Sequence, residues 1–360
     1  MRFLLRRTSC VTRGGRSVTG SELASAIKAQ ALGFGFDLVG ITRTGPAETA
    51  EHFDRWLADG HAGTMAYMEQ HAETRRDSRR PFERGSSAIV VALNYGGREP
   101  TGPVARYARG DDYHDVMWRK LDKLHVWINN HVGDETRARG YVDTGPLLER
   151  DLAQRAGLGW FGKNTNLISP TLGSFFFIGA LLIDLELEPD SPFEADRCGS
   201  CRLCLDACPT NAFAAPRVLD ATRCISYLTI ELRGSIPLDL RQAVGGLLYG
   251  CDICQDVCPW NVRFAADLRE DAFRPRDIVR SNDARTIALE LLAMDEASYQ
   301  TAFRGSAMKR AKRRGLARNA AVTLGNIGDT RDIAALTRAL DDQEPVVGEH
   351  AAWALEQMSR

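Results

Sequence analysis

The sequence predicts an α/β domain, then a cysteine-rich domain, then a C-terminal α-helical region. Strand-like and helix-like segments alternate from residue 21 to residue 190, which is typical of an α/β domain. Eight of the nine cysteines then fall between residues 198 and 258. A weak repeat at a spacing of 31 residues aligns 318–324 with 349–355 and predicts paired helices. The predicted boundaries are a flexible lead-in over 1–20, the α/β domain over 21–190, the cysteine-rich domain over 191–265 and the helical region over 266–360.

Length and composition are those of a soluble globular protein with two or three domains. The 360 residues are 44% hydrophobic and 26% charged, and the net charge is −1. Any attraction to nucleic acid or membrane must therefore come from local patches. The longest apolar run, residues 175–183, is too short to span a bilayer as a helix, and the arginine-rich start lacks the apolar segment of a signal peptide. We expect a cytoplasmic protein without membrane association, and we expect it to be a monomer.

Hydrophobic spacing predicts the elements of the α/β domain. Leu23, Ile27 and Leu32 recur at helical spacing after Ser21, which is a suitable N-cap. The β-branched run at 86–94 is typical of a core strand. In chain order, the predicted elements are a helix over 21–32, a strand over 36–41, a helix over 47–58, a strand over 86–94, a helix over 115–131, a short strand from 141 into a turn, a helix over 147–156 and a strand over 174–183.

Two loops of this domain allow both a structural and a functional interpretation. Asp143 lies in the segment Tyr-Val-Asp-Thr-Gly-Pro at 141–146, where an aspartate is often only a turn cap. The same position, at the end of a strand, is where α/β enzymes place reactive groups. The small and soft apolar side chains at 61–68 form either a packed loop or a surface that lets backbone approach a flat ligand.

The glycine-rich segment at 157–164 matches G-x-G-x-x-G but not its required context. A dinucleotide fingerprint follows a strand, whereas this segment follows a predicted helix, so its first glycine is interpreted as a helix C-cap. A phosphate loop needs Ser or Thr after its lysine, and Asn164 stands there instead. Both nucleotide interpretations are rejected. What remains is a turn whose Lys163, Asn164 and Asn166 suit an amide-rich or phosphate-bearing ligand.

The cysteines form two runs that both end in Cys-Pro. The first, from Cys198 to Pro209, reads C-x2-C-x2-C-x3-C-P, which is the bacterial ferredoxin signature; the second runs from Cys251 to Pro259. In such runs the fourth cysteine ligates the other cluster. The second run lacks one ligand because Leu248 occupies its position, and Cys224 is the cysteine left to replace it. The predicted ligands of two 4Fe–4S clusters are Cys198, Cys201, Cys204 and Cys258 for the first, and Cys208, Cys224, Cys251 and Cys254 for the second.

Disulfides and zinc are the competing explanations of the cysteines. Disulfides are rare in chains without a secretory signal. Zinc sites usually consist of two C-x2-C pairs. They require neither three cysteines in the pattern C-x2-C-x2-C nor a proline after the last cysteine. The iron–sulfur interpretation is therefore favoured, and Cys10, which stands apart, is predicted to be a free surface thiol.

From about Ser21 to Arg360 the chain resembles the epoxyqueuosine reductase family. Four features carry the resemblance: the cysteine array with its lone Cys224, and the segments 141–146, 157–165 and 258–261. The resemblance implies a nitroreductase-like α/β domain that binds base-off cobalamin, two 4Fe–4S clusters, and a tRNA that carries epoxyqueuosine at its wobble position. The corrinoid motif D-x-H-x-x-G is absent, since Asp112-Tyr113-His114 continues to Met117 where the motif has glycine. That absence agrees with a family that does not ligate cobalt through this histidine.

The resemblance also implies a mechanism and its residues. A flavodoxin or ferredoxin system would supply electrons to the clusters, and the clusters would reduce cobalamin one electron at a time. The epoxide oxygen would leave as water, with Asp143 as proton donor. Burial beside an apolar corrin is expected to raise the pKa of Asp143. The residues predicted for the corrin pocket are Met65, Ala66, Tyr67, Tyr107, Asp143, Lys163, Asn164 and Ser174.

The C-terminal third carries a local basic cluster. Seven basic residues and no acidic one lie between Arg304 and Arg318. In a nearly neutral chain this is typical of a phosphate-binding surface, and the alternative is a solvated helix face. The paired helices beyond it resemble HEAT-type repeats, which would present the basic face. The residues predicted to contact tRNA are Lys309, Arg310, Lys312, Arg313 and Arg314.

Two other classes of protein remain as alternatives. One is another corrinoid iron–sulfur reductase, such as a reductive dehalogenase, although such relatives usually carry an export signal and have no use for a basic helical tail. The other is a non-enzymatic ferredoxin-type electron carrier, which does not require a large α/β domain upstream.

Overall fold

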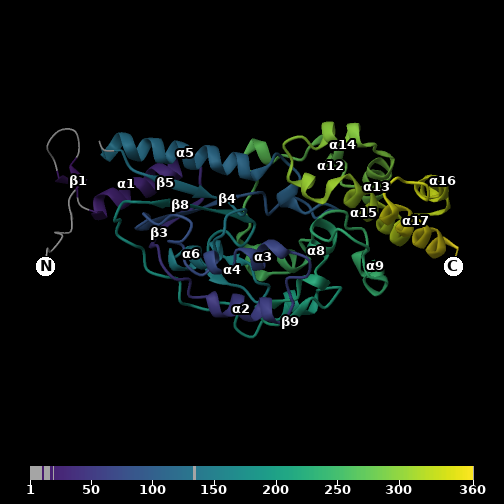
Figure 1. The fold of residues 1–360 in the computed structure, drawn as a ribbon, viewed down its shortest axis with the longest axis horizontal. Coiled ribbons are helices and arrows are strands. Elements are labelled where there is room, and N and C mark those ends of the chain that lie inside the picture. Colours follow the sequence, from purple (N-terminus) through teal and green to yellow (C-terminus); the bar gives the residue numbers. More distant parts are fainter. Residues whose placement is uncertain (1–9, 12–16, 19, 133–134, 360) are drawn as a thin grey trace.

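The computed structural model describes residues 10–11, 17–18, 20–132 and 135–359. Figure 1 shows an elongated molecule with the central sheet towards one end, the C-terminal helices at the other, and the cysteine-rich part between them. Most of the predicted lead-in, residues 1–20, lies outside the described residues. Within it, β1 (Cys10–Val11) pairs antiparallel with β2 (Ser17–Val18).

The central sheet has four strands in the order β3-β4-β8-β5. Their bounds are Leu38–Arg43 for β3, Ser87–Asn94 for β4, Ala138–Tyr141 for β5 and Phe176–Ile183 for β8. Alternating strands and helices are typical of a parallel sheet, but every pair here is antiparallel. The reason is visible in the register: Arg43 pairs with Ser87, so the long connection between β3 and β4 leaves and re-enters the sheet at the same end. The chain therefore has mixed α and β content, and its central sheet contains no parallel βαβ unit among the described residues.

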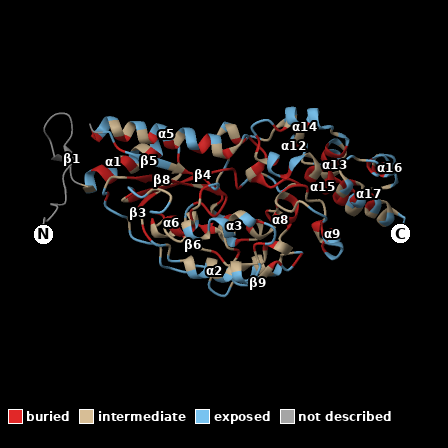
Figure 2. Ribbon diagram, in the orientation of Figure 1, coloured by how far each residue is buried: buried red, intermediate tan, exposed pale blue. Residues whose placement is uncertain are grey.

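Each face of the sheet is buried against its own helices. Successive side chains of a strand point to opposite faces. In β4, Ile89 and Val91 belong to the core shared with α1 (Gly20–Gly33) and α5 (Tyr113–Val132), whereas Val90 belongs to the core shared with α6 (Glu149–Arg155). Figure 2 shows the resulting burial of β4 and β8 between the two layers. The hydrophobic run of a strand buried on both sides explains why the sequence located these two strands within about two residues.

The helix boundaries of this domain differ slightly from the predicted ones. Helix α1 begins at Gly20, so Ser21 lies in its first turn and is not the N-cap. The C-cap residue of α6 is Ala156, and Gly157 follows it with a left-handed φ of 79°, so the glycine ends the helix one residue beyond the predicted C-cap position. The connection between β3 and β4 contains α2 (Ala50–Ala58), α3 (Ala66–Gln70) and α4 (Ala72–Arg75).

The cysteine-rich part consists of short elements joined by loops. Its hairpins and helices are β6 (Trp160–Phe161) with β7 (Leu167–Ile168), β9 (Phe213–Ala215) with β10 (Val218–Leu219), α7 (Leu203–Asp206), α8 (Ile225–Ile230), α9 (Leu238–Val244), α10 (Ile253–Asp256) and α11 (Pro259–Phe264). The proline of the second Cys-Pro pair occupies the first position of α11, where its missing N–H costs no hydrogen bond.

The C-terminal region is helical, as predicted. Its helices are α12 (Asp277–Arg280), α13 (Ala284–Ala293), α14 (Glu296–Ala302), α15 (Lys312–Ile327), α16 (Ile333–Ala339) and α17 (Pro345–Met358). The two repeat segments lie in α15 and α17, which pack against each other. Likeness to HEAT repeats stays a prediction. Leu248 and Tyr249 join the core of these helices and anchor them to the cysteine-rich part. None of the helices in the described part of the chain has the length and apolarity needed to span a bilayer.

Candidate functional site

Asp143 lies just after β5, at the end of the sheet where β4 ends and β8 begins. Its backbone has a left-handed φ of 55°, which is uncommon for a residue with a side chain and occurs most often at turns and functional sites. Tyr113 Oη donates a hydrogen bond to Asp143 Oδ2 at 2.7 Å. The Nε2 atom of His114 is 3.7 Å from the same oxygen. The turn thus places a carboxylate against two groups from the start of α5.

Sequence reasoning did not identify His114 as a functional residue. Asp112 accepts a hydrogen bond from the backbone N–H of His114 at 3.1 Å, and Asp112 Oδ1 also lies 2.6 Å from His114 Nδ1. The ring stacks on Tyr113 with centroids 4.0 Å apart. His114 Nε2 is buried and has no hydrogen-bond partner among the described residues. The available signal is Asp112, an acidic residue two positions before a histidine at the start of a helix.

The pKa values of this group run opposite to the prediction for Asp143. Burial favours the neutral imidazole, yet the hydrogen bond with Asp112 and the negative charges of Asp112 and Asp143 outweigh it and raise the pKa of His114 to about 9. Partial desolvation raises the pKa of Asp143, but the nearby positive charge of His114 and the hydrogen bond from Tyr113 outweigh it and lower that pKa. The expectation of a raised pKa for Asp143 is therefore wrong for this structure. At neutral pH the proton of the pair resides on His114.

The charge on His114 is expected to stabilise the fold in a pH-dependent way. Because its pKa rises from 6.5 to about 9 on folding, the stabilisation is complete below 6.5 and is lost as the pH rises through about 9. Thermal unfolding of the wild type and of His114→Gln, compared from neutral pH upward, should show a gap that closes above about 9. A gap that stays constant over this range would mean that packing, and not charge, explains the effect of the substitution.

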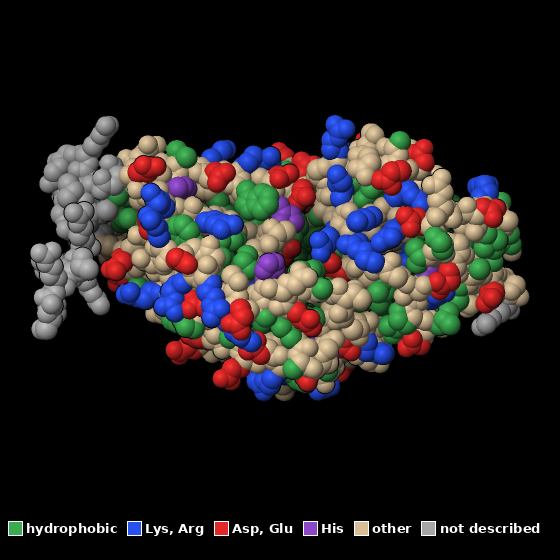
Figure 3. Space-filling view, viewed as in Figure 1, with side chains coloured by type: hydrophobic (Ala, Val, Ile, Leu, Met, Phe, Trp, Pro, Cys, Tyr) green, Lys and Arg blue, Asp and Glu red, His purple; other side chains and the backbone are tan. Residues whose placement is uncertain are grey.

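Three tyrosines lie near enough to Asp143 to be affected by its charge. Its negative charge helps to raise the pKa of Tyr67, Tyr107 and Tyr113, for each of which burial is the larger cause. The rings of Tyr107 and Tyr113 are 6.1 Å apart, and Tyr113 stacks on Phe177 at 4.2 Å. Even with these neighbours, the side chain of Asp143 is 68% exposed. Figure 3 shows a hollow in the middle of the visible face, bordered by histidine side chains and by a group of Lys and Arg side chains. Aromatic walls beside an accessible carboxylate suit a large, flat and mostly apolar ligand.

The other predicted pocket residues separate into two groups. Met65 is buried in a cluster with Tyr227, and Ala66 is exposed at the start of α3. Lys163, Asn164 and Ser174 instead hold the cluster loops. Lys163 Nζ donates to the carbonyls of Gly199 and Cys201, Asn164 to that of Cys254, and Ser174 Oγ to the Oε1 of Gln255. Contact of these residues with a corrin stays a prediction.

The first predicted set of cysteines comes together. Burial, together with the nearby Cys258, Cys198 and Cys201, raises the pKa of Cys204 to about 11. Trp160 donates its indole N–H to Cys198 Sγ at 3.5 Å, a contact that sequence reasoning did not anticipate. The fourth member thus arrives from the distant second run, as the crossed arrangement requires.

The second set also comes together and includes the lone cysteine. Burial raises the pKa of Cys251 to about 12, and the neighbouring Cys224 and Cys208 contribute to the rise. Cys251 and Cys224 also lie near Cys254, whose pKa is raised well above its ordinary value, mainly by burial. Across the described chain, no group of three His, Cys, Asp or Glu side chains is arranged to hold a single metal ion. A cube of iron and sulfide is larger than one ion, so wider spacing of the thiols is consistent with clusters.

The second set lies beside the tyrosines of the Asp143 site. A Cβ added to Gly250 would lie 2.7 Å from Ala105 and 3.5 Å from Tyr107. Arg106 binds Asp252 through its backbone N–H at 2.9 Å and its guanidinium at 3.0 Å. The loop that carries Cys251 is therefore fixed against the segment that carries Tyr107. Electrons held by the second set would need to travel only a short way to a ligand beside Asp143.

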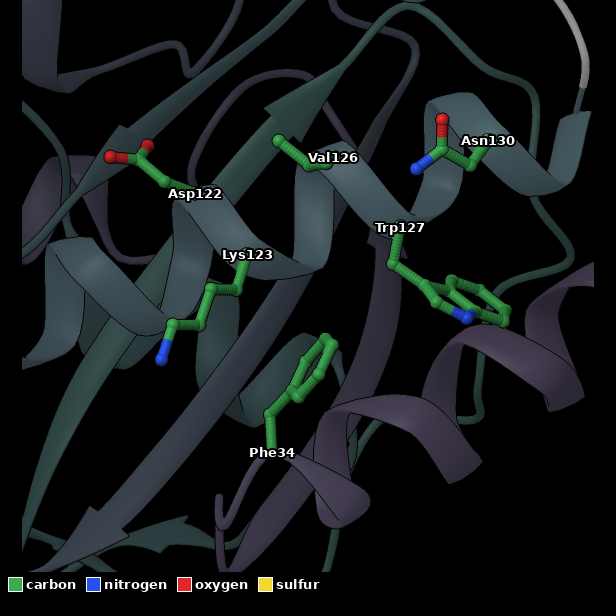
Figure 4. Close-up of a pocket in the computed structure, with 6 residues that line it drawn as sticks. All are labelled: Phe34, Asp122, Lys123, Val126, Trp127 and Asn130. Atoms are coloured by element: carbon green, nitrogen blue, oxygen red, sulfur yellow. The ribbon is translucent and has the colours of Figure 1, made fainter.

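A shallow hollow beside α5 has neither the cysteines nor the tyrosines of the Asp143 site in its lining. It has a volume of about 380 Å³ and is lined by Phe34 and by α5 residues that include Val126 and Trp127 (Figure 4). Its charged residues, Asp122 and Lys123, are exposed on α5, and none of the described cysteines lines it. We therefore place the candidate active site at Asp143.

The basic cluster is only partly available for phosphates. Arg310 forms two hydrogen bonds of 2.8 Å with Glu231, and its guanidinium lies over the ring of Tyr67 at 5.3 Å. Arg313 is paired with Asp342 at 2.6 Å, and Arg318 is buried and donates to backbone carbonyls. Arg314 lies 3.7 Å from Glu344. The exposed basic residues of this segment are Arg304, Lys309, Arg310 and Lys312.

Two sets of four thiols next to a separate Asp–His–Tyr site define an iron–sulfur redox protein whose bond chemistry takes place outside the clusters. Comparison with known proteins specifies the family. Residues 197–261 match a 4Fe-4S double cluster binding domain, and residues 75–144 match the model described as "Epoxyqueuosine reductase QueG, DUF1730". The chain is 41% identical to the epoxyqueuosine reductase of Xanthomonas campestris pv. campestris over 349 residues, which cover 94% of this chain and 96% of the relative. It belongs to the epoxyqueuosine reductase family.

Other relatives agree. The Escherichia coli K12 epoxyqueuosine reductase is 38% identical over 347 residues, covering 94% of this chain and 90% of the relative. A crystal structure of an epoxyqueuosine reductase with an epoxyqueuosine-modified tRNA-Tyr stem loop superposes with a TM-score of 0.81 at 30% identity, covering 94% of this chain and 91% of the other. The Bacillus subtilis enzyme, in a structure with its catalytic aspartate loop swung out of the active site, gives 0.82 at 30% identity, with coverage of 94% and 90%.

Proposed function

We propose that this protein reduces epoxyqueuosine to queuosine at the wobble position of tRNA, the last step of queuosine formation. The observation that carries the proposal is the position of Asp143 beside the second set of cysteines in a chain of the epoxyqueuosine reductase family. A relative of the same fold has been crystallised with an epoxyqueuosine-bearing stem loop. The simplest test is nucleoside analysis of tRNA from a strain that lacks the gene: epoxyqueuosine should accumulate and queuosine should disappear. Unaltered queuosine levels would falsify the proposal.

The cofactors are two 4Fe–4S clusters and base-off cobalamin. The two sets of thiols fit the clusters, because each brings four sulfur ligands together from both runs. The aromatic walls around the accessible Asp143 fit a corrin, and Tyr67, Tyr107 and Tyr113 would line its site. When bound, cobalamin supplies the low-potential electrons that the epoxide requires.

Asp143 and His114 supply the proton. Removing the epoxide oxygen takes two electrons and two protons and releases one water, so an acid must protonate the oxygen as its bond to carbon breaks. Asp143 is the accessible member of the pair, since its side chain is more exposed than that of His114. His114 holds the proton at neutral pH and lies 3.7 Å from Asp143, so it can return a proton to the carboxylate after each transfer. Asp112 orients the imidazole through its other nitrogen.

The exposed lysines of the basic cluster are proposed to bind tRNA phosphates. Lys309→Gln with Lys312→Gln should weaken binding of a tRNA stem loop several-fold and lower its salt dependence by about one unit for each phosphate that is no longer neutralised. Titrations at several salt concentrations measure both effects. The matched control is Lys123→Gln with Arg338→Gln, because both side chains are exposed, one on α5 and the other on α16. Unchanged affinity and salt dependence would make the lysines an ordinary solvated surface. Reversing Arg313 is not informative, because it breaks the pair with Asp342.

Other expectations concern the setting of the enzyme. The monomeric state, the cytoplasmic location and a flavodoxin or ferredoxin donor stay predictions, as do the domain boundaries and the free thiol at Cys10.

A further inference from the structure

Helix α11 is an exposed element directly attached to the first set of cysteines. Cys258, which is buried, immediately precedes this helix. Four residues later, Val262 is 78% exposed, and Arg263 beside it is also exposed. One end of α11 therefore holds a predicted cluster ligand, while its outer side presents an apolar and a cationic side chain to solvent.

Aromatic packing makes the base of this surface rigid. Trp160, which donates to Cys198, meets the ring of Trp260 edge-on at 4.9 Å. Trp260 in turn stacks on Phe264 at 5.4 Å. These contacts connect the outer side of α11 to the thiols through closely packed rings. A protein seated on α11 would thus lie close to the first cluster, and short separation is what electron tunnelling requires.

The charge around α11 is positive. The Arg197 guanidinium lies over Trp260 at 5.9 Å, and the Arg263 guanidinium lies over Phe264 at 5.1 Å. Within the described residues, neither arginine forms an ion pair. Arg263 also lines a hollow of about 470 Å³ together with Arg98 and Arg269, each of which is paired with an aspartate. The two unpaired arginines therefore give this surface its net positive charge, and contacts with aromatic rings hold them in place.

The second set of cysteines is not accessible in the same way. Its loops are fixed by Asn164, which donates to the carbonyl of Cys254, and by the Arg106–Asp252 pair. Leu248 and Tyr249, just before Cys251, are buried against the C-terminal helices. Electrons from another protein would thus enter at the first set and leave from the second, which lies beside Tyr107.

We propose that Arg197, Trp260, Val262 and Arg263 form the docking site of a small acidic one-electron carrier protein. The inference rests on the proposed function, which requires an external source of single electrons. An exposed apolar residue on a surface that carries two unpaired cations suits a partner with an acidic rim around its redox centre. Redox encounters use small interfaces, in which charge complementarity raises the association rate more than the affinity.

The test measures cluster reduction directly. The cluster-loaded protein is mixed anaerobically with a reduced acidic flavodoxin, and bleaching of the iron–sulfur absorbance gives a second-order rate constant. The double variant Arg197→Glu with Arg263→Glu should lower this constant by about 10-fold or more at low salt, and the difference should shrink at high salt. The matched control is Arg84→Glu with Arg338→Glu, which changes the net charge equally at exposed arginines before β4 and in α16.

Two further readouts separate the possible outcomes. Iron content and reduction by a neutral photoreductant should be unchanged in the double variant, which excludes loss of the cluster. Signals of isotopically labelled oxidised flavodoxin should broaden on titration with the wild type and not with the double variant. A wild-type rate constant in the double variant would overturn the proposal, as would weakened stem-loop binding with normal reduction. Because tRNA is absent from the reduction assay, its result does not depend on the identity of the nucleoside substrate.

Discussion

Asp143→Asn is expected to lower turnover by about 10²- to 10⁴-fold, the usual contribution of a positioned acid. Asparagine has nearly the same shape and can still accept the hydrogen bond from Tyr113, but it cannot donate an acidic proton. The measurement is single-turnover conversion of an epoxyqueuosine-bearing stem loop, followed by nucleoside analysis. Cluster absorbance and corrin content should stay at wild-type levels.

The matched control is Asp122→Asn, which changes an exposed aspartate on the outer side of α5. It should leave turnover unchanged. If Asp143→Asn converts its substrate as fast as the wild type, Asp143 is not the proton donor. In that case His114, which holds the proton at neutral pH, becomes the group to test.

Cys224→Ala is expected to remove the second cluster and abolish turnover. The iron content after anaerobic reconstitution should fall from about eight to about four per chain, because a 4Fe–4S cluster needs four thiolates and none is spare. Structure and spacing agree on this residue, since Cys224 lies with Cys208 and Cys251. Metal analysis and absorbance of the purified variant provide the measurement.

The control for this variant is Cys10→Ala, because Cys10 stands apart from the cysteine array in the sequence. Its iron content should equal that of the wild type. Wild-type iron content in Cys224→Ala would show that the second cluster takes its fourth ligand elsewhere, and the assignment of the lone cysteine would have to be abandoned.

The features that the sequence could predict share a local origin. The spacing of Cys198, Cys201 and Cys204 is fixed by the covalent chain. Three cysteines at this spacing therefore indicate cluster ligation without any knowledge of the fold. The same holds for β4 and β8, whose uninterrupted hydrophobic runs reflect burial on both faces. Helical spacing in the C-terminal third likewise predicted helices that the structure contains. The exchange of one cysteine between the two runs also follows from the motif, in which the fourth cysteine ligates the other cluster. The structure brings the same thiols together.

What only the tertiary structure decided depends on contacts between distant residues. His114 meets Asp143 across 29 positions of the chain, and this contact reverses the direction of the predicted pKa shift. Arg313 and Arg318 look like members of a basic face in the sequence, but one pairs with Asp342 and the other is buried among carbonyls. The sheet direction was also decided by long-range pairing. Composition determines which groups a chain contains, whereas the electric field and the partners of each group are set only when the fold brings remote segments together.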